Sequence, residues 1–381
     1  MSFDCIVIGA GLAGIVAARD LEKSGKNVLL IEASDNVGGR VRSDHINGFI
    51  LDRGFQVINP KYPQVKRSNL IKELDFKMIS AKIKLVDLDL LVGVTPASFS
   101  GQIGSITEKI RFLKFIASAS PANSYAFGDY TGAFPALYAK VLKPFLTGVF
   151  LCDPEKIAAD VVHEILRSFV KSLPGVPANG VGEFSKALAR PIKNVLLNES
   201  VVKIAGNLVT THNSSYSGKY VIVATDGKSA NKLIAGSKEC ETLSSCTYYF
   251  AVDDHPDLSK YLHISANSRA VNAIVISKVS RNYAPAGKHL ISVTSLHALS
   301  ESDFRSEASS LLAIPREKLE YVNHYEIINS LPFHGPRGSR NENLFVSDQT
   351  FVIGDHKALP SQEGAMRTGA QVAQMINQLM R

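Results

Sequence analysis

Residues 3–32 read FDCIVIGAGLAGIVAARDLEKSGKNVLLIE, and the architecture of the chain can be inferred outward from this segment. It begins with a short apolar run rich in β-branched residues, Phe3–Ile8, which ends at a glycine and is typical of a buried parallel strand. Apolar residues then recur at helical spacing until Gly25, which predicts a helix that stops there. Asn27–Ile31 predicts a second strand. The segment therefore predicts a strand–helix–strand unit of an α/β fold.

The turn between the first strand and the helix has the glycine pattern GxGxxG. Gly9 permits the tight turn, Gly11 lets the backbone approach a pyrophosphate, and Gly14 lets the helix pack on the strand. The helix N-terminus adds free N–H groups and a partial positive charge for the phosphates. Glu32 lies 18 residues after Gly14, where a carboxylate can hydrogen-bond ribose hydroxyls and disfavours the 2′-phosphate of NADP.

A glycine-rich turn without a ligand is the alternative, but the strand–turn–helix–strand context favours a Rossmann-type dinucleotide site. In this first part of the chain, we expect cofactor contacts from Gly9, Gly11, Leu12, Ala13, Glu32 and Ala33.

A second glycine pair follows in Gly38–Ser43, which reads GGRVRS. This segment resembles the GGRxxS/T motif of the superfamily that contains flavin monoamine oxidase, protoporphyrinogen oxidase and phytoene desaturase. In that superfamily the arginine contacts the diphosphate region of FAD. Arg40 suits this role because a guanidinium is a planar, permanently charged partner for phosphate, and the alternative is a solvated loop arginine. The resemblance implies that the cofactor is FAD.

Further segments extend the resemblance over nearly the whole chain. Residues 51–57, LDRGFQV, match the place where the superfamily runs its backbone past the isoalloxazine ring. Residues 219–226, KYVIVATD, resemble the strand that closes the Rossmann unit, and Val202 matches a residue beside the adenine. Residues 351–356, FVIGDH, and the helix opening at 360–366, PSQEGAM, resemble the segments that bind the ribityl chain and the flavin C2=O. By this resemblance, the remaining cofactor contacts are expected from Gly39, Arg40, Arg53, Gly54, Phe55, Val202, Ala224, Thr225, Gly354, Asp355, Gln362, Gly364 and Ala365.

The stretches between these motifs predict a second domain that the chain enters twice. The first stretch is expected to be largely helical after about Thr107, and the second has strand-like runs at Cys246–Val252, Ala270–Ile276 and His289–Val293. These runs predict an antiparallel sheet that floors a pocket. We thus expect an α/β, Rossmann-type FAD-binding domain with an interleaved α+β substrate domain. The boundaries that follow are 1–58, 178–229 and 347–381 for the FAD-binding domain, and 59–177 and 230–346 for the substrate domain.

The bulk properties limit the partners of the chain. Its 42 Lys and Arg exceed its 35 Asp and Glu, and the net charge of +7 fits acidic partners or an anionic membrane surface. No basic block, zinc-finger or RNA-binding signature is present, so no nucleic-acid partner is expected. Four cysteines without CxxC spacing are typical of reduced thiols, which favours a cytoplasmic location. No apolar run has the length of a membrane span, so only peripheral contact with a membrane stays open. No pattern of metal ligands is found either.

The resemblance implies an FAD-dependent oxidoreductase that transfers a hydride from a substrate C–H bond to flavin N5. Oxygen, a quinone or another carrier is expected as the electron acceptor, because no second GxGxxG indicates an NAD(P)H site. Oxidation or desaturation of a largely apolar small molecule is favoured over an amine oxidase that releases peroxide. Ser361 stands where many amine oxidases carry an aromatic residue, and the chain has no Trp. The third hypothesis for the function is a catalytically silent FAD-binding scaffold.

No catalytic acid or base can be assigned from the sequence. His356 follows the ribityl aspartate, and Arg53 could face the flavin N1–C2=O edge, a substrate acid group or a structural ion-pair partner. Aromatic side chains are expected to line the substrate pocket, although such residues more often belong to the core. These candidates are Phe127, Tyr130, Phe134, Tyr138, Phe145, Tyr248 and Phe250.

Overall fold

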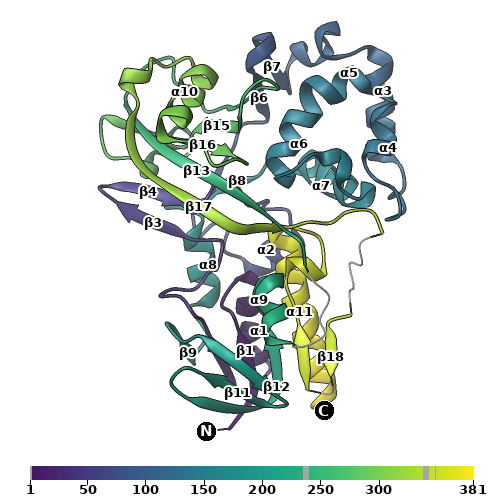
Figure 1. Ribbon diagram of the computed structural model, residues 1–381, viewed down its shortest axis with the longest axis vertical. Helices are drawn as coiled ribbons and strands as arrows, with labels where there is room; N and C mark the ends of the chain where they lie inside the picture. Colours follow the sequence, from purple (N-terminus) through teal and green to yellow (C-terminus); the bar gives the residue numbers. More distant parts are fainter. Residues whose placement is uncertain (1, 235–239, 338–342, 348) are drawn as a thin grey trace.

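The computed structural model describes residues 2–234, 240–337, 343–347 and 349–381. The described chain contains two large sheets with helices packed around them (Figure 1). A mixed sheet whose central strands are parallel occupies the lower part of that view, and a largely antiparallel sheet lies above it, next to a group of helices. The prediction of an α/β fold with a Rossmann-type unit and an additional α+β part is confirmed.

The lower sheet has the strand order β10-β11-β12-β1-β2-β9, and β19 and β18 join it beside β12. Its strands are β1 (Ser2–Ile8), β2 (Val28–Ile31), β9 (Val195–Leu196), β10 (Val201–Ala205), β11 (Leu208–Thr211), β12 (Ser215–Val223), β18 (Phe345–Ser347) and β19 (Thr350–Val352). β1 pairs in parallel with both β2 and β12, so Ile8 lies beside Ile31 and Val223 in the register. The carboxyl ends of three strands therefore meet at one edge, where open α/β sheets bind their ligands.

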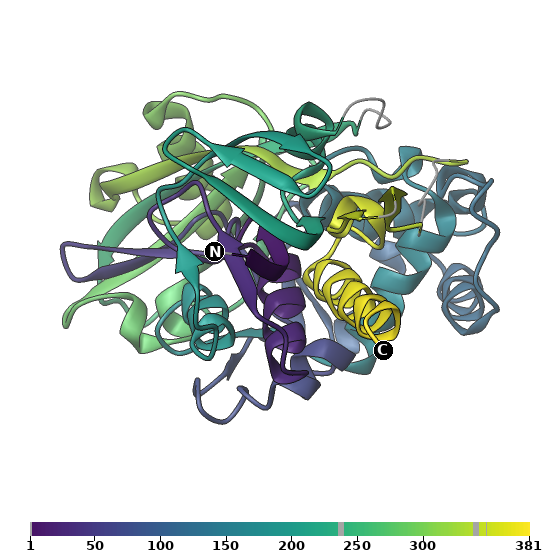
Figure 2. The same ribbon diagram turned by 90° about the horizontal axis from the view of Figure 1, so that it is seen from below.

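Helices α1 (Leu12–Lys23) and α11 (Gln362–Leu379) come from opposite ends of the chain and pack against each other. Figure 2 shows them side by side, in purple and yellow. Gly369 allows this close packing, because a Cβ there would lie 2.3 Å from the carbonyl oxygen of Ala13 on α1. Gly14 lets α1 lie close to the end of β1, because a Cβ on it would lie 1.9 Å from the carbonyl oxygen of Gly9. The role of Gly14 in helix–strand packing agrees with the sequence pattern.

The upper sheet has the order β17-β13-β16-β15-β14-β6-β7. Its strands are β6 (Lys82–Leu85), β7 (Leu90–Gly93), β13 (Thr242–Asp253), β14 (Leu262–Ile264), β15 (Ala270–Val275), β16 (Lys288–Ser295) and β17 (Glu320–Pro332). Alternate side chains of β13 face opposite ways. Tyr248 and Phe250 pack under α10 (Glu301–Leu312), whereas Tyr249 and Ala251 join the core shared with the lower sheet.

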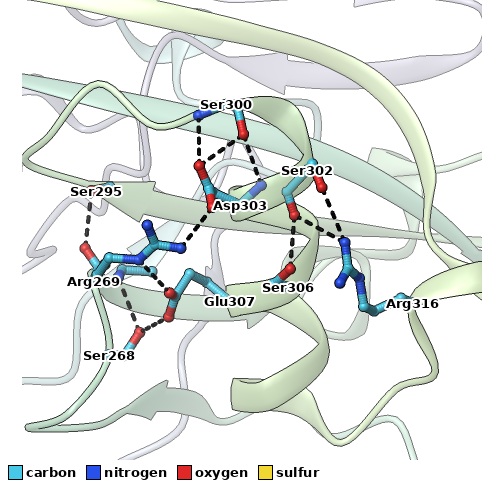
Figure 3. Close-up of polar contacts among 10 residues, drawn as sticks. Ser268, Arg269, Ser295, Ser300, Ser302, Asp303, Ser306, Glu307 and Arg316 are labelled. Atoms are coloured by element: carbon cyan, nitrogen blue, oxygen red, sulfur yellow. Dashed lines mark hydrogen bonds and ion pairs between the residues drawn. The ribbon is translucent and has the colours of Figure 1, made fainter.

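A polar cluster ties α10 to the beginning of β15 (Figure 3). Arg269, the residue before β15, forms ion pairs with Asp303 and Glu307, both 2.9 Å long. The carbonyl oxygen of Arg269 also accepts a 3.0 Å hydrogen bond from the Ser295 hydroxyl on β16. These contacts hold the first residues of β15 at a defined position on the sheet.

The helical part of the structure has its own apolar core. Its helices are α3 (Ile106–Ala117), α4 (Gly128–Thr131), α5 (Pro135–Leu137), α6 (Lys143–Phe150) and α7 (Ala159–Lys171). The remaining α-helices and strands of the described residues are α2 (Pro63–Ser68), α8 (Gly182–Ala189), α9 (Gly227–Leu233), and the short pairs β3 (Ser43–Ile46) with β4 (Phe49–Asp52) and β5 (Lys77–Met78) with β8 (Gly175–Val176). Among the described residues, no helix combines the length and apolar character needed to cross a membrane. The domain boundaries stay a prediction.

Candidate functional site

A cavity of about 890 Å³ lies where the carboxyl edge of the lower sheet meets the upper sheet and the helices α6 and α7. Every predicted cofactor residue except Val202 and Gly364 lines it. Residues far apart in the chain thus meet at one cavity, although contact with the cofactor itself stays a prediction. We call the part of its wall next to the upper sheet and the helices that carries only uncharged, mostly apolar side chains the apolar half. The other part, the polar half, carries the charged lining residues Glu32, Arg40, Arg53, Glu199, Asp226, Lys232 and Asp355.

The glycine turn leaves the polar half open. Gly9 has a φ of +101°, and a Cβ there would lie 2.9 Å from the carbonyl oxygen of Ala224, so both backbone and packing require a glycine. A Cβ on Gly11 would meet no protein atom within 4 Å. Gly11 is also the N-cap of α1, whose first turn has no side-chain cap and no acidic residue. The uncapped N–H groups and the open space above Gly11 suit a phosphate group.

The carboxylate of Glu32 is held at the end of β2. Its Oε2 accepts a 2.7 Å hydrogen bond from the backbone N–H of Ala10, and its Oε1 accepts bonds of 2.9 and 2.7 Å from the N–H and hydroxyl of Ser34. Carboxylate oxygens can each accept more than one hydrogen bond. Glu32 lines the cavity and is positioned to accept ribose hydroxyls as well.

Arg40 and Asp355 form an ion pair of 2.8 Å in the wall of the polar half. The second guanidinium nitrogen of Arg40 donates to the carbonyl oxygen of Ser330 on β17, at 2.7 Å. Burial opposes ionisation of Asp355, but the Arg40 guanidinium outweighs this effect and lowers the pKa of the carboxyl below its ordinary value. Arg40 is therefore a fixed cation beside the cavity, and the alternative of a solvated loop arginine does not describe it.

Arg53 forms a two-point ion pair with Asp44, with Nε–Oδ2 and Nη2–Oδ1 distances of 2.9 and 3.1 Å. The Asp44 carboxylate also accepts a 2.8 Å hydrogen bond from the hydroxyl of Tyr325 on β17. Arg53 lines the cavity too. Of the roles that the sequence left open, the structural ion pair is present, and a role toward the flavin or the substrate stays a prediction.

At the N-terminus of α11, one expected cofactor residue, Gly364, has its N–H paired within the protein. Ser361 caps the helix and accepts a 3.0 Å hydrogen bond from the N–H of Gly364, so this N–H is already paired within the protein. A Cβ on Gly364 would lie 1.9 Å from the carbonyl oxygen of Leu359, which explains the glycine by packing. Gln362 and Ala365 line the cavity, and the buried Oε1 of Gln362 has no hydrogen-bond partner among the described residues.

Val202 also lies differently from the expectation. It is 47% exposed and does not line the cavity, whereas its neighbour Val201 does. The ladder between β10 and β11 has an irregularity between Val201 and Lys203, which changes the direction of side chains along the strand. The wall at this place is made by Val201 with Glu199 and Ser200.

His356 is half-buried and lies outside the cavity wall, with both ring nitrogens covered by protein atoms. Its ring packs against Gly354 and Gly227, where added Cβ atoms would lie 2.7 and 3.3 Å away. Neither ring nitrogen has a hydrogen-bond partner among the described residues, and burial lowers the pKa of the imidazole to about 4. The ring is therefore neutral at physiological pH, and its position outside the cavity wall gives no support to a catalytic acid or base there.

The apolar half contains no charged side chain among its described residues. They include Ile79, Ile83, Phe145, Val149, Leu151, Ile165, Phe169, Leu173, Leu262, Ile264 and Val271. Asn272 and Thr294 are among the few polar groups there. Of the seven aromatic residues expected at the pocket, only Phe145 lines it. Four of the others, Phe127, Phe134, Tyr248 and Phe250, are fully buried or nearly so in separate cores, and Tyr138 and Tyr130 pack in or against the helical core.

Comparisons with known proteins agree with this geometry. The sequence model of the family described as flavin containing amine oxidoreductase matches residues 12–377. An L-amino acid dehydrogenase of Synechocystis sp. is 26% identical over 61% of this chain and 58% of its own length. Putrescine oxidase of Kocuria rosea is 44% identical over 19% of this chain and 14% of its own length. The chain thus aligns with under two thirds of either relative.

Solved structures show the same fold. An oxidoreductase from Methanosarcina mazei superimposes with a TM-score of 0.79 at 17% identity, covering 98% of this chain and 100% of the other. Putrescine oxidase bound to putrescine gives a TM-score of 0.75 at 16% identity, with both chains fully covered. The chain belongs to the flavin-containing amine oxidoreductase family, and the resemblance stated from its motifs is confirmed.

FAD is the cofactor of this family, and the residues of the polar half fit it. The open space at Gly11 and the uncapped N-terminus of α1 suit the diphosphate, and the anchored carboxylate of Glu32 suits a ribose. Asp355 lines the cavity, and its carboxylate, whose pKa is lowered by Arg40, offers acceptor oxygens.

Proposed function

We propose that the protein is an FAD-dependent oxidoreductase that oxidises a C–H bond of a largely apolar small molecule. The observation that supports the substrate class most is the apolar half of the cavity, which adjoins the polar half and whose described lining carries no charged side chain. When FAD is bound, it supplies the hydride acceptor at N5, and the protein binds and orients the substrate.

The apolar half favours uncharged ligands, because a ligand that enters it loses its hydration shell. Burial of apolar surface contributes roughly 25 cal/mol per Å², whereas burial of an unpaired charge is strongly unfavourable. Among the described residues, no carboxylate lies there to pair with the distal ammonium of a diamine, and no lysine or arginine lies there to pair with a free acid. An uncharged ligand is therefore favoured.

Oxidation requires that two electrons leave the substrate. Bound FAD would take them up as a hydride, the accompanying proton would pass to water, and oxygen, a quinone or another carrier would later reoxidise the flavin. Phe145, Ile165 and Phe169 line this half, and their apolar side chains would keep water away from a substrate carbon bound beside them. His356 lies outside this wall, so the proposal assigns it no proton transfer.

The proposal is tested by anaerobic bleaching of the flavin. The purified holoprotein is mixed with a panel of apolar alcohols and polyenes, neutral and charged amines, and amino acids, and absorbance near the flavin maximum is followed. Bleaching by uncharged apolar compounds is expected. Bleaching by amines alone, with peroxide released on readmission of air, would support an amine oxidase instead. A flavin that no compound reduces would support a silent scaffold.

We further propose that helix α3 contacts an anionic membrane surface. Three of its apolar side chains, Ile106, Ile110 and Leu113, are 54, 48 and 62% exposed and follow helical spacing, whereas Phe115 and Ile116 are buried in the helical core. Lys114 and Arg111 on the same helix are exposed. An exposed apolar stripe flanked by basic residues suits the interface of anionic lipids. The cytoplasmic location stays a prediction.

A further inference from the structure

Strand β17 leaves the regular ladder of the upper sheet where it passes the cavity. Between its pairs with Ser245 and Leu243 on β13, β17 has three residues, 328–330, where β13 has one. Asn329, in the middle of the three, has a φ of +59°. Residues 327–331 all line the cavity. An irregularity of this kind redirects side chains, and such irregularities are frequent beside active sites.

The irregular segment is held in place by its own polar groups. The Oδ1 of Asn329 accepts a 2.6 Å hydrogen bond from the hydroxyl of Thr242. The carbonyl oxygen of Ser330 accepts the 2.7 Å bond from Arg40, and the Ser330 hydroxyl donates to the carbonyl oxygen of Ile327 at 2.8 Å. Arg40 belongs to the polar half, whereas Ser330 lies on the upper sheet and belongs to the apolar half. Ser330 therefore lies at the boundary where the two halves of the cavity meet.

The hydroxyls of Ser245 and Ser330 are 2.9 Å apart at this boundary, and both residues are half-buried and line the cavity. A serine hydroxyl has a single proton, and that of Ser330 is donated to the Ile327 carbonyl. Ser245 is therefore the donor in the bond between the two hydroxyls. Its oxygen retains lone pairs for a further bond, so Ser245 offers the cavity an acceptor of hydrogen bonds.

The geometry of β13 directs the Ser245 side chain toward the cavity. Alternate residues of a strand face opposite sides of the sheet. Tyr248 packs under α10 on the far side, whereas Tyr249 joins the core shared with the lower sheet. Thr247 lies on the same side as Tyr249, and its hydroxyl would be 4.0 Å from a Cβ on Gly54, which lines the cavity. Ser245 is two residues before Thr247 and therefore faces the same way.

We propose that Ser245 accepts a hydrogen bond from the hydroxyl of an alcohol substrate, and that this hydroxyl is borne by the carbon that is oxidised. The inference rests on the proposed function, because FAD in the polar half and a substrate in the apolar half would meet at this boundary. The C–H bond would break as a hydride to bound FAD, the O–H proton would pass to water, and the C–O bond would become a carbonyl. The apolar chain of the alcohol would then extend along the apolar half.

An alcohol suits this position better than an amine. An alkylamine is largely protonated at neutral pH, since an amine such as that of a lysine side chain has a pKa near 10.4. The described lining of the apolar half contains no carboxylate, and the nearby carboxylate of Asp355 is already paired with Arg40. An ammonium group at Ser245 would thus lack a free counter-charge, whereas an uncharged hydroxyl needs only an acceptor. Ser245 is therefore assigned as a specificity-determining residue.

The test compares 1-octanol with 1-fluorooctane, which has nearly the same shape and no hydrogen-bond donor. The flavin of the holoprotein is first reduced with dithionite, so that no probe is oxidised, and both affinities are measured by anaerobic isothermal titration calorimetry. The ratio of the octanol affinity to the fluorooctane affinity is expected to fall about tenfold from the wild-type protein to Ser245→Ala, as the loss of one hydrogen bond gives. The affinity for fluorooctane and the flavin content should stay unchanged.

Ser244→Ala is the matched control, because Ser244 is exposed and does not line the cavity, and its affinity ratio should equal that of the wild-type protein. Ser245→Cys is a second variant of nearly the same size, and its sulfur is a weaker acceptor, so it should lower the ratio even if Ser245→Ala loses its flavin. A ratio that is unchanged in the Ser245 variants, or that falls equally in Ser244→Ala, would overturn this inference and leave the proposed function standing. A holoprotein that binds neither probe would overturn the proposed function, and the role of Ser245 with it.

Discussion

Arg40 and Asp355, which are 315 residues apart in the chain, form a 2.8 Å ion pair in the wall of the cavity. Arg40 follows the second strand of the lower sheet, and Asp355 follows β19, so the pair joins the two ends of the chain. Because Arg40 also donates to Ser330 on β17, the same guanidinium connects the two sheets. The polar half of the cavity is therefore complete only when both ends of the chain and the upper sheet are in place.

Replacement of Arg40 by methionine tests this joint role. The variant leaves the buried Asp355 carboxylate without its cation, so we expect a loss of about 1–3 kcal/mol in stability. We also expect the Kd for FAD to rise about tenfold or more, through the loss of a charge-assisted contact. Denaturant unfolding and FAD titration measure the two effects. Arg190→Met, which removes an exposed pair with Glu73, serves as the control, and an equal effect there would contradict the prediction.

Two glycines of the GxGxxG pattern are expected to respond differently to replacement by alanine, because Gly11 borders open space and Gly14 is closely packed. Gly11→Ala adds a methyl group that meets no protein atom within 4 Å, so stability without FAD should change by less than about 1 kcal/mol. FAD affinity should fall about tenfold or more, because that space is assigned to the diphosphate. Gly14→Ala places a methyl group 1.9 Å from the Gly9 carbonyl oxygen and should cost about 1–3 kcal/mol or more in stability. Thermal unfolding and FAD titration of both variants separate these effects, and a stable Gly14→Ala protein would refute the assignment.

The polar half could be predicted from the sequence because phosphate and ribose binding require particular residues at particular points of the chain. A glycine is needed where φ is positive, as at Gly9, and a carboxylate is needed at the end of the second strand, as at Glu32. Each of these requirements concerns residues that are close together in the sequence. Gly364 does not line the cavity and its N–H donates to Ser361, a capping contact that the motif does not reveal, so its contact with the cofactor stays a prediction.

The apolar half could not be predicted in the same way. Its walls, such as Ile83 and Phe169, have the same local pattern as core residues, and only the tertiary arrangement decides which apolar side chains face a cavity. Phe127 and Tyr248 were expected there and pack in separate cores. Asn272 carried a usable signal, since a polar residue inside the apolar strand AVNAIV needs a partner.

Asp52 gives a prediction for the pH dependence of stability. Burial raises the pKa of its carboxyl from 3.8 to about 6, despite hydrogen bonds from Ser43, Tyr283 and Val181. A carboxyl with a raised pKa binds more protons in the folded state, so its contribution becomes less favourable as pH rises from about 4 to 6 and is constant above that. Two pKa units correspond to about 3 kcal/mol.

Asp52→Asn removes this titration. The free energy of unfolding of the variant minus that of the wild-type protein should therefore increase between pH 4 and pH 6, by up to about 3 kcal/mol, and then stay level. Urea unfolding at pH 4, 5, 6 and 7 measures the difference, in which the titration of all other carboxyl groups cancels. A difference that is flat across this range would mean that Asp52 titrates as an ordinary carboxyl group.

Membrane contact through α3 is tested with a charge placed in the exposed stripe. Ile110→Glu puts a carboxylate among Ile106 and Leu113, which opposes both burial in the interface and attraction to anionic lipid. Flotation with vesicles of phosphatidylserine and phosphatidylcholine should show the wild-type protein with the vesicles and the variant in the soluble fraction. Leu379→Glu changes a side chain of similar exposure at the end of α11 and should still float. Identical behaviour of all three proteins would exclude α3 as the contact.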